Sequence, residues 1–454
     1  MPFVEHWNPE DRRFWARAGR AVAARNLCLS VPALTLAFAV WMLWSAVVVH
    51  LPAVGFHYST NQLFWLTALP ALSGATLRIF YAFAVPIVGG RRFTALATAS
   101  LLLPALGIGF AVQDPGTPYE WMVLLALSCG LGGANFASSM AHISFFFPKA
   151  QKGYALGLYA GLGHLGVALV QMVVPVVIGV GAFGALVGQP QATAEGPVWL
   201  QNAGFVWVPF IAASALAAWF GMDDLADARA GFPEQAVVFT RKHNWLMCWL
   251  YLGTFGSFIG FAAGLPLLIQ SQFARGDLAQ GAWLGPLVGA LLRPLGGWLA
   301  DRLGGGRITF WSFVVMAVAV AAVLRFLPQG GHEGSLAGFL AAFGVLFAAS
   351  GIGNGSTFRM IACIFPAQRR QDAEPLPAAQ AQAAVDGHLE AAAVLGLASA
   401  IGAYGGFFIP KILGTAIASS GSPAPALHVF ILFYVTCITL TWWFYSRRNA
   451  AMPC

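Results

Sequence analysis

Long apolar runs separated by short polar gaps dominate the chain. A helix that crosses a membrane needs about 20 apolar residues. Such runs lie near residues 29–53, 62–88, 93–113, 120–147, 154–184, 201–222, 243–271, 280–303, 306–327, 335–363, 389–418 and 424–446. The longest polar gaps are 1–28, 223–242 and 366–388, and each is too short for a folded soluble domain. The pattern therefore predicts an all-α membrane protein with twelve transmembrane helices.

Composition supports a membrane protein. Of the 454 residues, 58% are hydrophobic and 9% are charged, with a net charge of +7, whereas a soluble domain carries roughly 25% charged residues. The positive charge does not indicate a nucleic-acid partner, because the cations stand in short clusters between apolar runs.

The positions of lysine and arginine predict the orientation. With the N-terminus in the cytoplasm, 18 of the 24 cations fall in cytoplasmic segments, and only Arg275 and Arg325 fall outside. This bias follows the positive-inside rule. The first apolar run is too long for a signal-peptide core, so we expect it to be retained. Both termini are expected in the cytoplasm.

The second and eighth apolar segments repeat each other. Aligned without gaps at an offset of 215 residues, Arg78 matches Arg293 and Gly89 matches Gly304. The fifth and eleventh segments also match, with Gly163 on Gly402 and Gly166 on Gly405. Parallel repeats of six helices are typical of secondary transporters, whose substrate sites lie near the membrane midplane between the repeats.

The repeat divides the chain into five predicted regions. These are a cytoplasmic N-terminal segment (1–28), an N-terminal six-helix bundle (29–222), a cytoplasmic linker (223–242), a C-terminal six-helix bundle (243–446) and a cytoplasmic tail (447–454). Together they predict two pseudo-repeated six-helix bundles.

Arg78 and Arg293 are the strongest candidates for a binding site. Both fall inside predicted spans that offer no carboxylate at the same depth, and a lone arginine there costs at least a few kcal/mol. A bound anion would offset that cost, because guanidinium donates paired hydrogen bonds to planar oxyanions. Phosphate and carboxylate also satisfy this geometry. Each arginine could instead bond backbone carbonyls or extend to an interface, and we expect anchoring roles for Arg359 and Lys411.

Glycines concentrate in the repeated fifth and eleventh segments. The candidates are Gly157, Gly161, Gly163, Gly402, Gly405 and Gly406. Spacings of four, as between Gly157 and Gly161, allow close helix packing. Smooth contacts of this kind could also slide during a conformational change, and the two interpretations are compatible.

Several motifs resemble the nitrate/nitrite porter family of the major facilitator superfamily over nearly the whole chain. They include GGANFASSMAHISFFFPKAQKGYALGL from Gly132, YLGTFGSFIGF from Tyr251, RPLGGWLADRLGG from Arg293 and AAAVLGLASAIGAYGGFFIP from Ala391. The resemblance implies that Arg78 and Arg293 clamp the anion. It also implies that Phe136 and Phe255 sandwich the anion and that Tyr251 donates a hydrogen bond to it.

Two positions depart from the family pattern, in which asparagine usually stands at Tyr159 and at His164. His164 could hydrogen-bond nitrate, carry a proton near neutral pH, or simply pack between helices. We therefore expect a nitrate–nitrite exchanger working by alternating access and leave nitrate–proton symport open, with His164 as the proton carrier. A rival from another class is a membrane redox subunit that binds b-type haem through His50, His142 or His164.

The expected protein is a transporter and not an enzyme, with no cofactor and no metal. The six cysteines are far apart in sequence and form no CxxC, so we expect buried thiols and no disulfide. The GxxxxGK[ST] pattern of ATP-binding loops does not occur in the sequence. The expected partners are nitrate, nitrite and the lipid bilayer, the expected state is a monomer, and the expected location is the inner membrane. Nitrate respiration and nitrate assimilation both fit.

Overall fold

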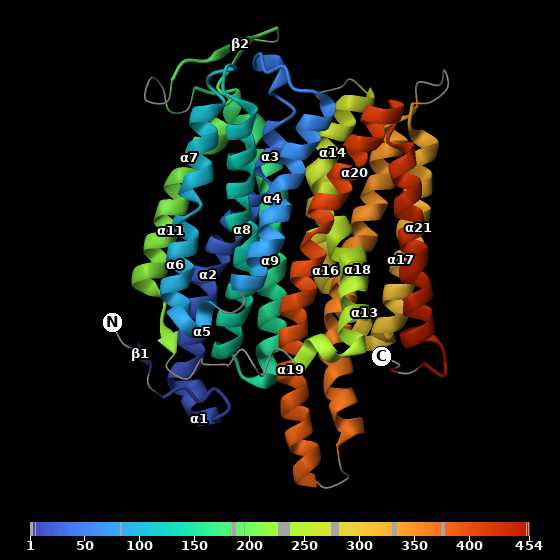
Figure 1. Ribbon diagram of the computed structural model, residues 1–454. Coiled ribbons are helices and arrows are strands. Elements are labelled where there is room, and N and C mark those ends of the chain that lie inside the picture. Colours follow the sequence, from blue (N-terminus) through green and yellow to red (C-terminus); the bar gives the residue numbers. More distant parts are fainter. Residues whose placement is uncertain are drawn as a thin grey trace. The chain divides into compact units, whose positions relative to one another are not determined.

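The computed structural model describes residues 3–4, 6–81, 84–181, 183, 188–194, 196–225, 237–273, 281–328, 334–373, 377–450, 452 and 454. Within these ranges the chain is almost entirely helical (Figure 1). It divides into two compact units. The first unit comprises Met1–Ala230, Phe261–Leu287 and Gly406–Gly414, and the second comprises Gly231–Gly260, Val288–Gly405 and Thr415–Cys454.

The first half of the chain supplies most of the first unit. Its helices are α1 (Arg12–Phe14), α2 (Arg20–Trp41), α3 (Leu43–Val47), α4 (Thr60–Tyr81), α5 (Ala84–Val88), α6 (Gly90–Ala99), α7 (Leu102–Ala111), α8 (Tyr119–Phe146), α9 (Lys149–Ile178), α10 (Asn202–Phe205) and α11 (Trp207–Gly221). Strand β1 (Phe3–Val4) pairs in parallel with β4 (Asp224–Leu225), and β2 (Gln191–Thr193) pairs antiparallel with β3 (Gly196–Val198). The first helix thus already begins upstream of residue 29, and residues 226–236 of the predicted linker lie outside the described residues.

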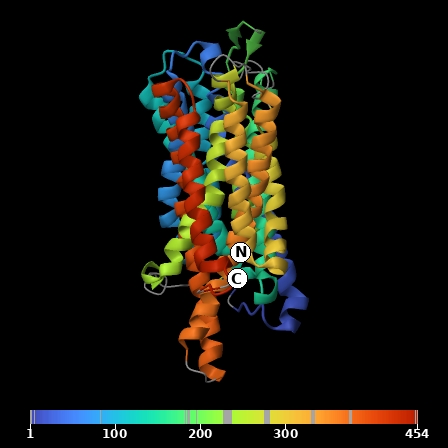
Figure 2. The same cartoon turned by 90° about the vertical axis from the view of Figure 1, so that its right-hand side faces the viewer.

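The second half supplies the remaining helices. They are α13 (Lys242–Tyr251), a π-helical turn (Leu252–Gly256), α14 (Ser257–Phe273), α16 (Leu284–Leu303), α17 (Gly305–Phe326), α18 (Leu336–Asp372), α19 (Pro377–Ala403), α20 (Gly405–Ser420) and α21 (Ala424–Thr441). Much of the polar gap at 366–388 is helical, because α18 and α19 continue into it. Figure 2 shows these two helices, in orange, extending past the red α21 of the same unit.

A buried carboxylate ties the base of this extension together. Glu390 in α19 is 6% exposed. Its two oxygens accept hydrogen bonds from Arg241 and Arg369, each at 2.7 Å. Arg369 belongs to α18, whereas Arg241 precedes α13. A carboxylate with two guanidinium partners can remain buried and ionised, since its charge is compensated on both sides.

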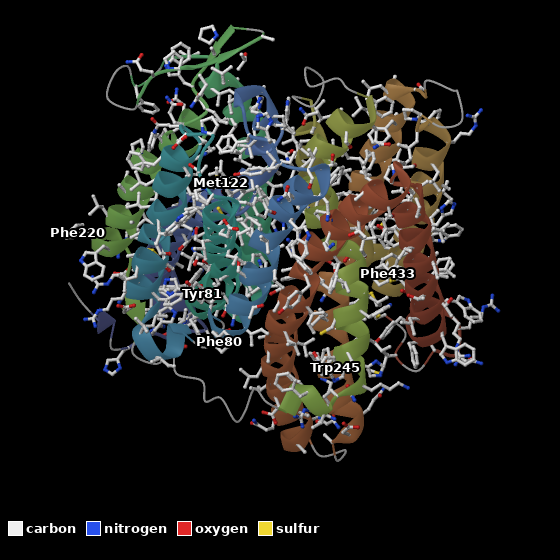
Figure 3. All side chains as sticks on the ribbon, turned by 45° about the horizontal axis from the view of Figure 1, so that its top comes forward. Phe80, Tyr81, Met122, Phe220, Trp245 and Phe433 are labelled. Atoms are coloured by element: carbon white, nitrogen blue, oxygen red, sulfur yellow. The ribbon has the colours of Figure 1, made fainter. Side chains whose placement is uncertain are left out.

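Eleven helices in the described part of the chain are long and apolar enough to cross a membrane. The segment predicted at 280–303 is α16, which has 20 residues but carries Arg293, Asp301 and Arg302. These charges lower the mean hydropathy of α16, which is not among the eleven. Large apolar side chains cover the outside of the helices. Phe220 of α11, 62% exposed, projects away from its helix (Figure 3).

The backbone confirms the repeat that the sequence predicts. Gly89 caps α6 with φ 91° and ψ 143°, and Gly304 caps α17 with φ 93° and ψ 131°. Side chains with a Cβ rarely adopt this conformation. The two glycines match at the offset of 215 residues, so the chain enters α6 and α17 through the same backbone conformation.

The cysteines depart partly from expectation. Cys129, Cys248 and Cys437 are buried, as predicted, and all six cysteines are free thiols. Cys28 is exposed on α2, so its predicted burial is wrong. An apolar surface that faces lipid accepts a thiol as readily as a core does, because neither environment demands a polar group.

A proline in α14 creates an unusual contact in the first unit. Pro266 has no N–H, so the carbonyl of Ala262, four residues earlier, lacks its helical donor. The buried side chain of Gln171 in α9 donates to that carbonyl at 2.7 Å and to the hydroxyl of Ser45 at 3.0 Å. Gln270 of α14 donates to the carbonyl of Val49 at 2.8 Å. These bonds hold the part of α14 beyond Phe261 against α9 and against the chain that follows α3.

The substitution Gln171→Leu should destabilise the protein. Leucine has a similar side-chain volume, but it leaves the carbonyl of Ala262 without the donor that Gln171 supplies. We expect the loss of this hydrogen bond to lower the free energy of unfolding by about 1 kcal/mol. The apparent melting temperature in detergent should fall. Gln151→Leu, an exposed position on the same helix, serves as the matched control. Equal melting temperatures for the two variants would contradict this assignment.

Candidate functional site

Arg78 lies in α4 and is completely buried, with 0% exposure. Its Nε and Nη2 atoms donate to the backbone carbonyl of Gly133 in α8, at 2.9 and 2.5 Å. A backbone carbonyl was one of the alternatives that the sequence left open. One carbonyl lowers the cost of burying the guanidinium but supplies no negative charge, so an anion remains a suitable ligand for this cation.

Aromatic rings surround the Arg78 guanidinium. Its Cζ atom lies 5.3 Å from the centroid of Trp41 and 5.1 Å from the centroid of Phe136. Distances of this order allow cation–π attraction, which strengthens when the cation is desolvated. We call Arg78, Trp41, Gly133, Phe136 and His164 the Arg78 cluster.

His164 joins this cluster through Phe136. The two rings stack at 5.8 Å with an interplanar angle of 10°. His164, 1% exposed, also meets Phe38 edge-on at 4.7 Å. The other departure from the family pattern, Tyr159, is buried and donates from its hydroxyl to the carbonyl of Ser30 at 3.4 Å. Tyr159 thus joins α9 to α2, whereas His164 lies one ring away from the buried arginine.

Arg293 occupies a comparable place in the second unit. It lies in α16 and is 5% exposed. Its Nη2 atom donates to the hydroxyl of Tyr251 at 3.4 Å, and its Cζ lies 5.3 Å from the ring of Phe358. Because the Tyr251 oxygen accepts in this bond, its own O–H can donate to a ligand. The ring centroids of Tyr251, the last residue of α13, and Phe255, in the π-helical turn that follows, lie 5.5 Å apart. Such turns are frequent at functional sites.

Glycines bring the helices that carry the arginines close to their neighbours. A Cβ on Gly130 would lie 2.5 Å from the backbone nitrogen of Gly74, four residues before Arg78. A Cβ on Gly351 would lie 2.2 Å from the carbonyl oxygen of Gly289, four residues before Arg293. The same close approach therefore positions each arginine within its own unit.

The signature glycines also make close contacts. A Cβ on Gly166 would lie 2.0 Å from the carbonyl oxygen of Thr35 in α2. A Cβ on Gly405 would lie 2.3 Å from the Cα of Gly256, and one on Gly402 would lie 2.8 Å from Cδ1 of Tyr251. Gly163 meets Leu34 of α2, where a Cβ would lie 2.6 Å from Cδ2. Gly163 and Gly166 thus let α9 approach α2, and Gly402 of α19 and Gly405 of α20 allow close contact with the segment from Tyr251 to Gly256.

Gly157 does not fit the packing prediction. A Cβ added there would meet nothing within 4 Å among the described residues, so close helix packing does not explain this glycine. The close contacts of α9 with α2 that are described lie instead at Gly163 and Gly166. Gly161 lies in α9 and Gly406 in α20.

The two remaining intramembrane cations have partners of their own. Arg359 of α18 forms an ion pair with Asp301 of α16. This ion pair is a contact that the expected anchoring role did not include. Lys411 of α20 lies 4.7 Å from the ring of Trp65 in α4, and both belong to the first unit. Neither cation takes part in the Arg78 cluster through any contact found in the described residues.

Comparison with known proteins identifies the family. The pattern of the Major Facilitator Superfamily matches residues 29–373. The chain belongs to this superfamily. Within it, the chain is a member of the nitrate/nitrite porter family, as three relatives show. It is 48% identical to the nitrate/nitrite transporters NarU of Salmonella typhimurium and of Escherichia coli, covering 98% of this chain and 96% of each relative. It is 40% identical to the probable nitrate/nitrite antiporter NarK2 of Thermus thermophilus, covering 100% and 98%.

A solved structure of the superfamily supports the fold. A bacterial homologue of the human lysosomal transporter Spinster, in an inward-facing and occupied conformation, superimposes with a TM-score of 0.61. The match covers 91% of this chain and 95% of that structure, at 16% sequence identity. At this identity the likeness concerns the superfamily fold alone.

Three residues that contact Arg78 or Arg293 escaped the sequence analysis: Trp41, Gly133 and Phe358. The signal for Phe358 is present but weak. GIGNGSTF from Gly351 resembles GLGGANF from Gly130, although the phenylalanine stands one residue later. Trp41 is one of 16 tryptophans in an apolar chain, so nothing in the sequence distinguishes it. This porter places Trp41 at the site only through the packing of α2 on α8.

Replacing two glycines of the same helix should give opposite results. Gly166→Ala puts a methyl group against the backbone of α2, which cannot yield, and should lower the apparent melting temperature. The Cβ of Gly157→Ala meets no neighbour among the described residues. This substitution should be neutral or stabilising by up to about 1 kcal/mol, because alanine favours helices over glycine. The apparent melting temperature in detergent measures the stability of each variant. A stable Gly166→Ala protein would disprove the close approach of α9 to α2.

Proposed function

We propose that the protein transports nitrate and nitrite across the membrane by alternating access and catalyses no chemical conversion. The observation that carries the proposal is the pair of buried arginines at matched positions of the repeat. The relatives that match nearly the full chain bear the names of nitrate/nitrite transporters. The alternative of a haem-binding redox subunit loses its basis, because the chain belongs to a superfamily of transporters.

In this proposal both arginines bind the anion. Arg78 and Arg293 supply positive charge and directed N–H groups, which suit a planar oxyanion. The hydroxyl of Tyr251 donates a further hydrogen bond. The aromatic rings of Phe136 and Phe255 keep water away from the anion. Such a site binds an anion, and its proposed residues include no carboxylate to which a cation could bind.

Exchange follows from the charge of the empty site. Without an anion, each guanidinium remains buried in a span whose sequence offers no carboxylate at the same depth. Reorienting that empty carrier should be slow, because the buried charge is poorly compensated. A bound nitrate or nitrite supplies the missing charge, so movement in both directions occurs mainly with an anion bound.

The alternative is nitrate–proton symport through His164. The surroundings of His164 favour exchange instead. Its ring lies against Phe38 and Phe136, and the ring of Phe136 also lies beside Arg78. A proton on His164 would put a second positive charge within one aromatic ring of a buried guanidinium, which is unfavourable. We propose that His164 stays neutral and contributes packing and a hydrogen bond.

We further propose an inner-membrane location with both termini in the cytoplasm and a monomeric carrier. The support for the orientation is the distribution of 18 cations in the proposed cytoplasmic segments against two outside. Arg91 and Arg92 at the start of α6, and Arg307 in α17, then lie on the cytoplasmic side.

Replacing either arginine by lysine should abolish most transport. Lysine keeps the charge but loses the planar fork, so nitrate uptake into nitrite-loaded proteoliposomes should fall at least tenfold, from the loss of roughly 1.5–3 kcal/mol of charge-assisted bonding. Arg325→Lys, an exposed arginine at the end of α17, is the matched control. Normal uptake by both Arg78→Lys and Arg293→Lys would rule out the two-arginine site.

The driving force can be tested with vesicles that differ only in their contents. Nitrate uptake should require internal nitrite and should not respond to an inward proton gradient. His164→Asn should leave the pH dependence unchanged, as should His57→Asn at an exposed position. Gradient-driven uptake into empty vesicles, lost in His164→Asn but kept in His57→Asn, would establish symport instead.

A further inference from the structure

Trp41 is the most tightly enclosed aromatic residue of the Arg78 cluster. It ends α2, where the helix breaks at Met42, and it is 0% exposed. Its Nε1 atom donates to the carbonyl of Pro70 in α4 at 2.8 Å. The side chain thus links the first helix of the unit to the helix that carries Arg78.

Two glycines leave room for the Nε1 edge of the indole ring. A Cβ on Gly133 would lie 2.4 Å from Cε2 of Trp41, and a Cβ on Gly74 would lie 2.9 Å from its Nε1. Gly133 belongs to α8 and Gly74 to α4. Any larger residue at either position would occupy the space of the ring, so this socket and the hydrogen bond to Pro70 together fix the orientation of the indole.

The fixed ring in turn restricts Arg78. The carbonyl of Gly133 holds one edge of the guanidinium through Nε and Nη2. The ring of Trp41, whose centroid lies 5.3 Å from Cζ, packs against the guanidinium and adds a restraint on the tilt of its plane. Gly133 takes part in both restraints, because it holds the guanidinium and also lines the socket of Trp41.

We propose that Trp41 is a positioning residue that sets the plane of the Arg78 guanidinium for a planar oxyanion. This inference rests on the proposed function. Trp41 acts through Arg78 and needs no contact with the anion. A misaligned guanidinium still carries its charge, so loss of the ring should weaken anion binding more than it slows the movement of the loaded carrier.

The experiment measures nitrate uptake by full-length protein in nitrite-loaded proteoliposomes, as KM and maximal rate. The variants are Trp41→Phe and Trp41→Leu. Trp44→Phe and Trp44→Leu are matched controls, because Trp44 in α3 is also 0% exposed and has no contact with Arg78 among those found. Apparent melting temperatures are recorded for all four, so that loss of packing is seen separately.

A positioning role predicts a split between the kinetic constants. Trp41→Leu should raise KM by roughly 5- to 30-fold, the range expected for a desolvated cation–π contact, with a maximal rate within about twofold. Trp41→Phe should restore most of the affinity, because it keeps an aromatic face. The Trp44 variants should change stability but not KM.

Two outcomes would overturn the inference. One is an unchanged KM in both Trp41 variants. The other is a rise in KM that the Trp44 variants share, which would mean a packing effect. If Trp41→Leu does not fold, Trp41→Phe against Trp44→Phe decides the question, since a rise of about two- to fivefold is then expected for Trp41 alone. Arg78→Lys, measured in parallel, tests the site itself: full activity there would defeat the proposed function and not merely the role of Trp41.

Discussion

A guanidinium buried in an apolar helix bundle needs acceptors for its N–H groups, because water cannot supply them. In the first unit the carbonyl of Gly133 is one such acceptor, and it reaches Arg78 because α4 and α8 approach closely. That approach depends on Gly130 and Gly74, whose backbones leave no room for a Cβ between them. The glycines of α8 therefore determine where the charged group can lie, and the aromatic rings close around it.

The second unit satisfies the same constraint with related parts. Gly351 and Gly289 bring α18 against α16, and Phe358 of α18 then lies beside Arg293. One acceptor described for Arg293 is the Tyr251 hydroxyl, which retains a hydrogen to donate. One arginine is thus held by a backbone carbonyl and the other by a side chain, so substitution of Tyr251 can alter one arginine without disturbing its equivalent.

The helices of the second repeat do not stay within one unit. Beyond Phe261, α14 belongs to the first unit, as does the stretch Gly406–Gly414 of α20. The changes of unit follow the π-helical turn that ends at Gly256 and the break between α19 and α20 at Tyr404. Gly256 and Gly405 meet at these two interruptions. Polar side chains hold the part of α14 that belongs to the first unit. Gln171 donates to the carbonyl of Ala262, which lacks a helical donor because Pro266 has no N–H.

The sequence by itself determined the helical membrane fold, the repeat and the two arginines, because hydrophobic runs, matched glycines and isolated charges are local features. It could not determine contacts between residues far apart in the chain. Trp41 and Gly133 join the Arg78 cluster through helix packing, and Gly157 lies apart from the neighbours that its spacing suggested. Arg359 pairs with Asp301 from another helix. Only the tertiary structure decides such contacts, because they depend on which faces of the helices meet.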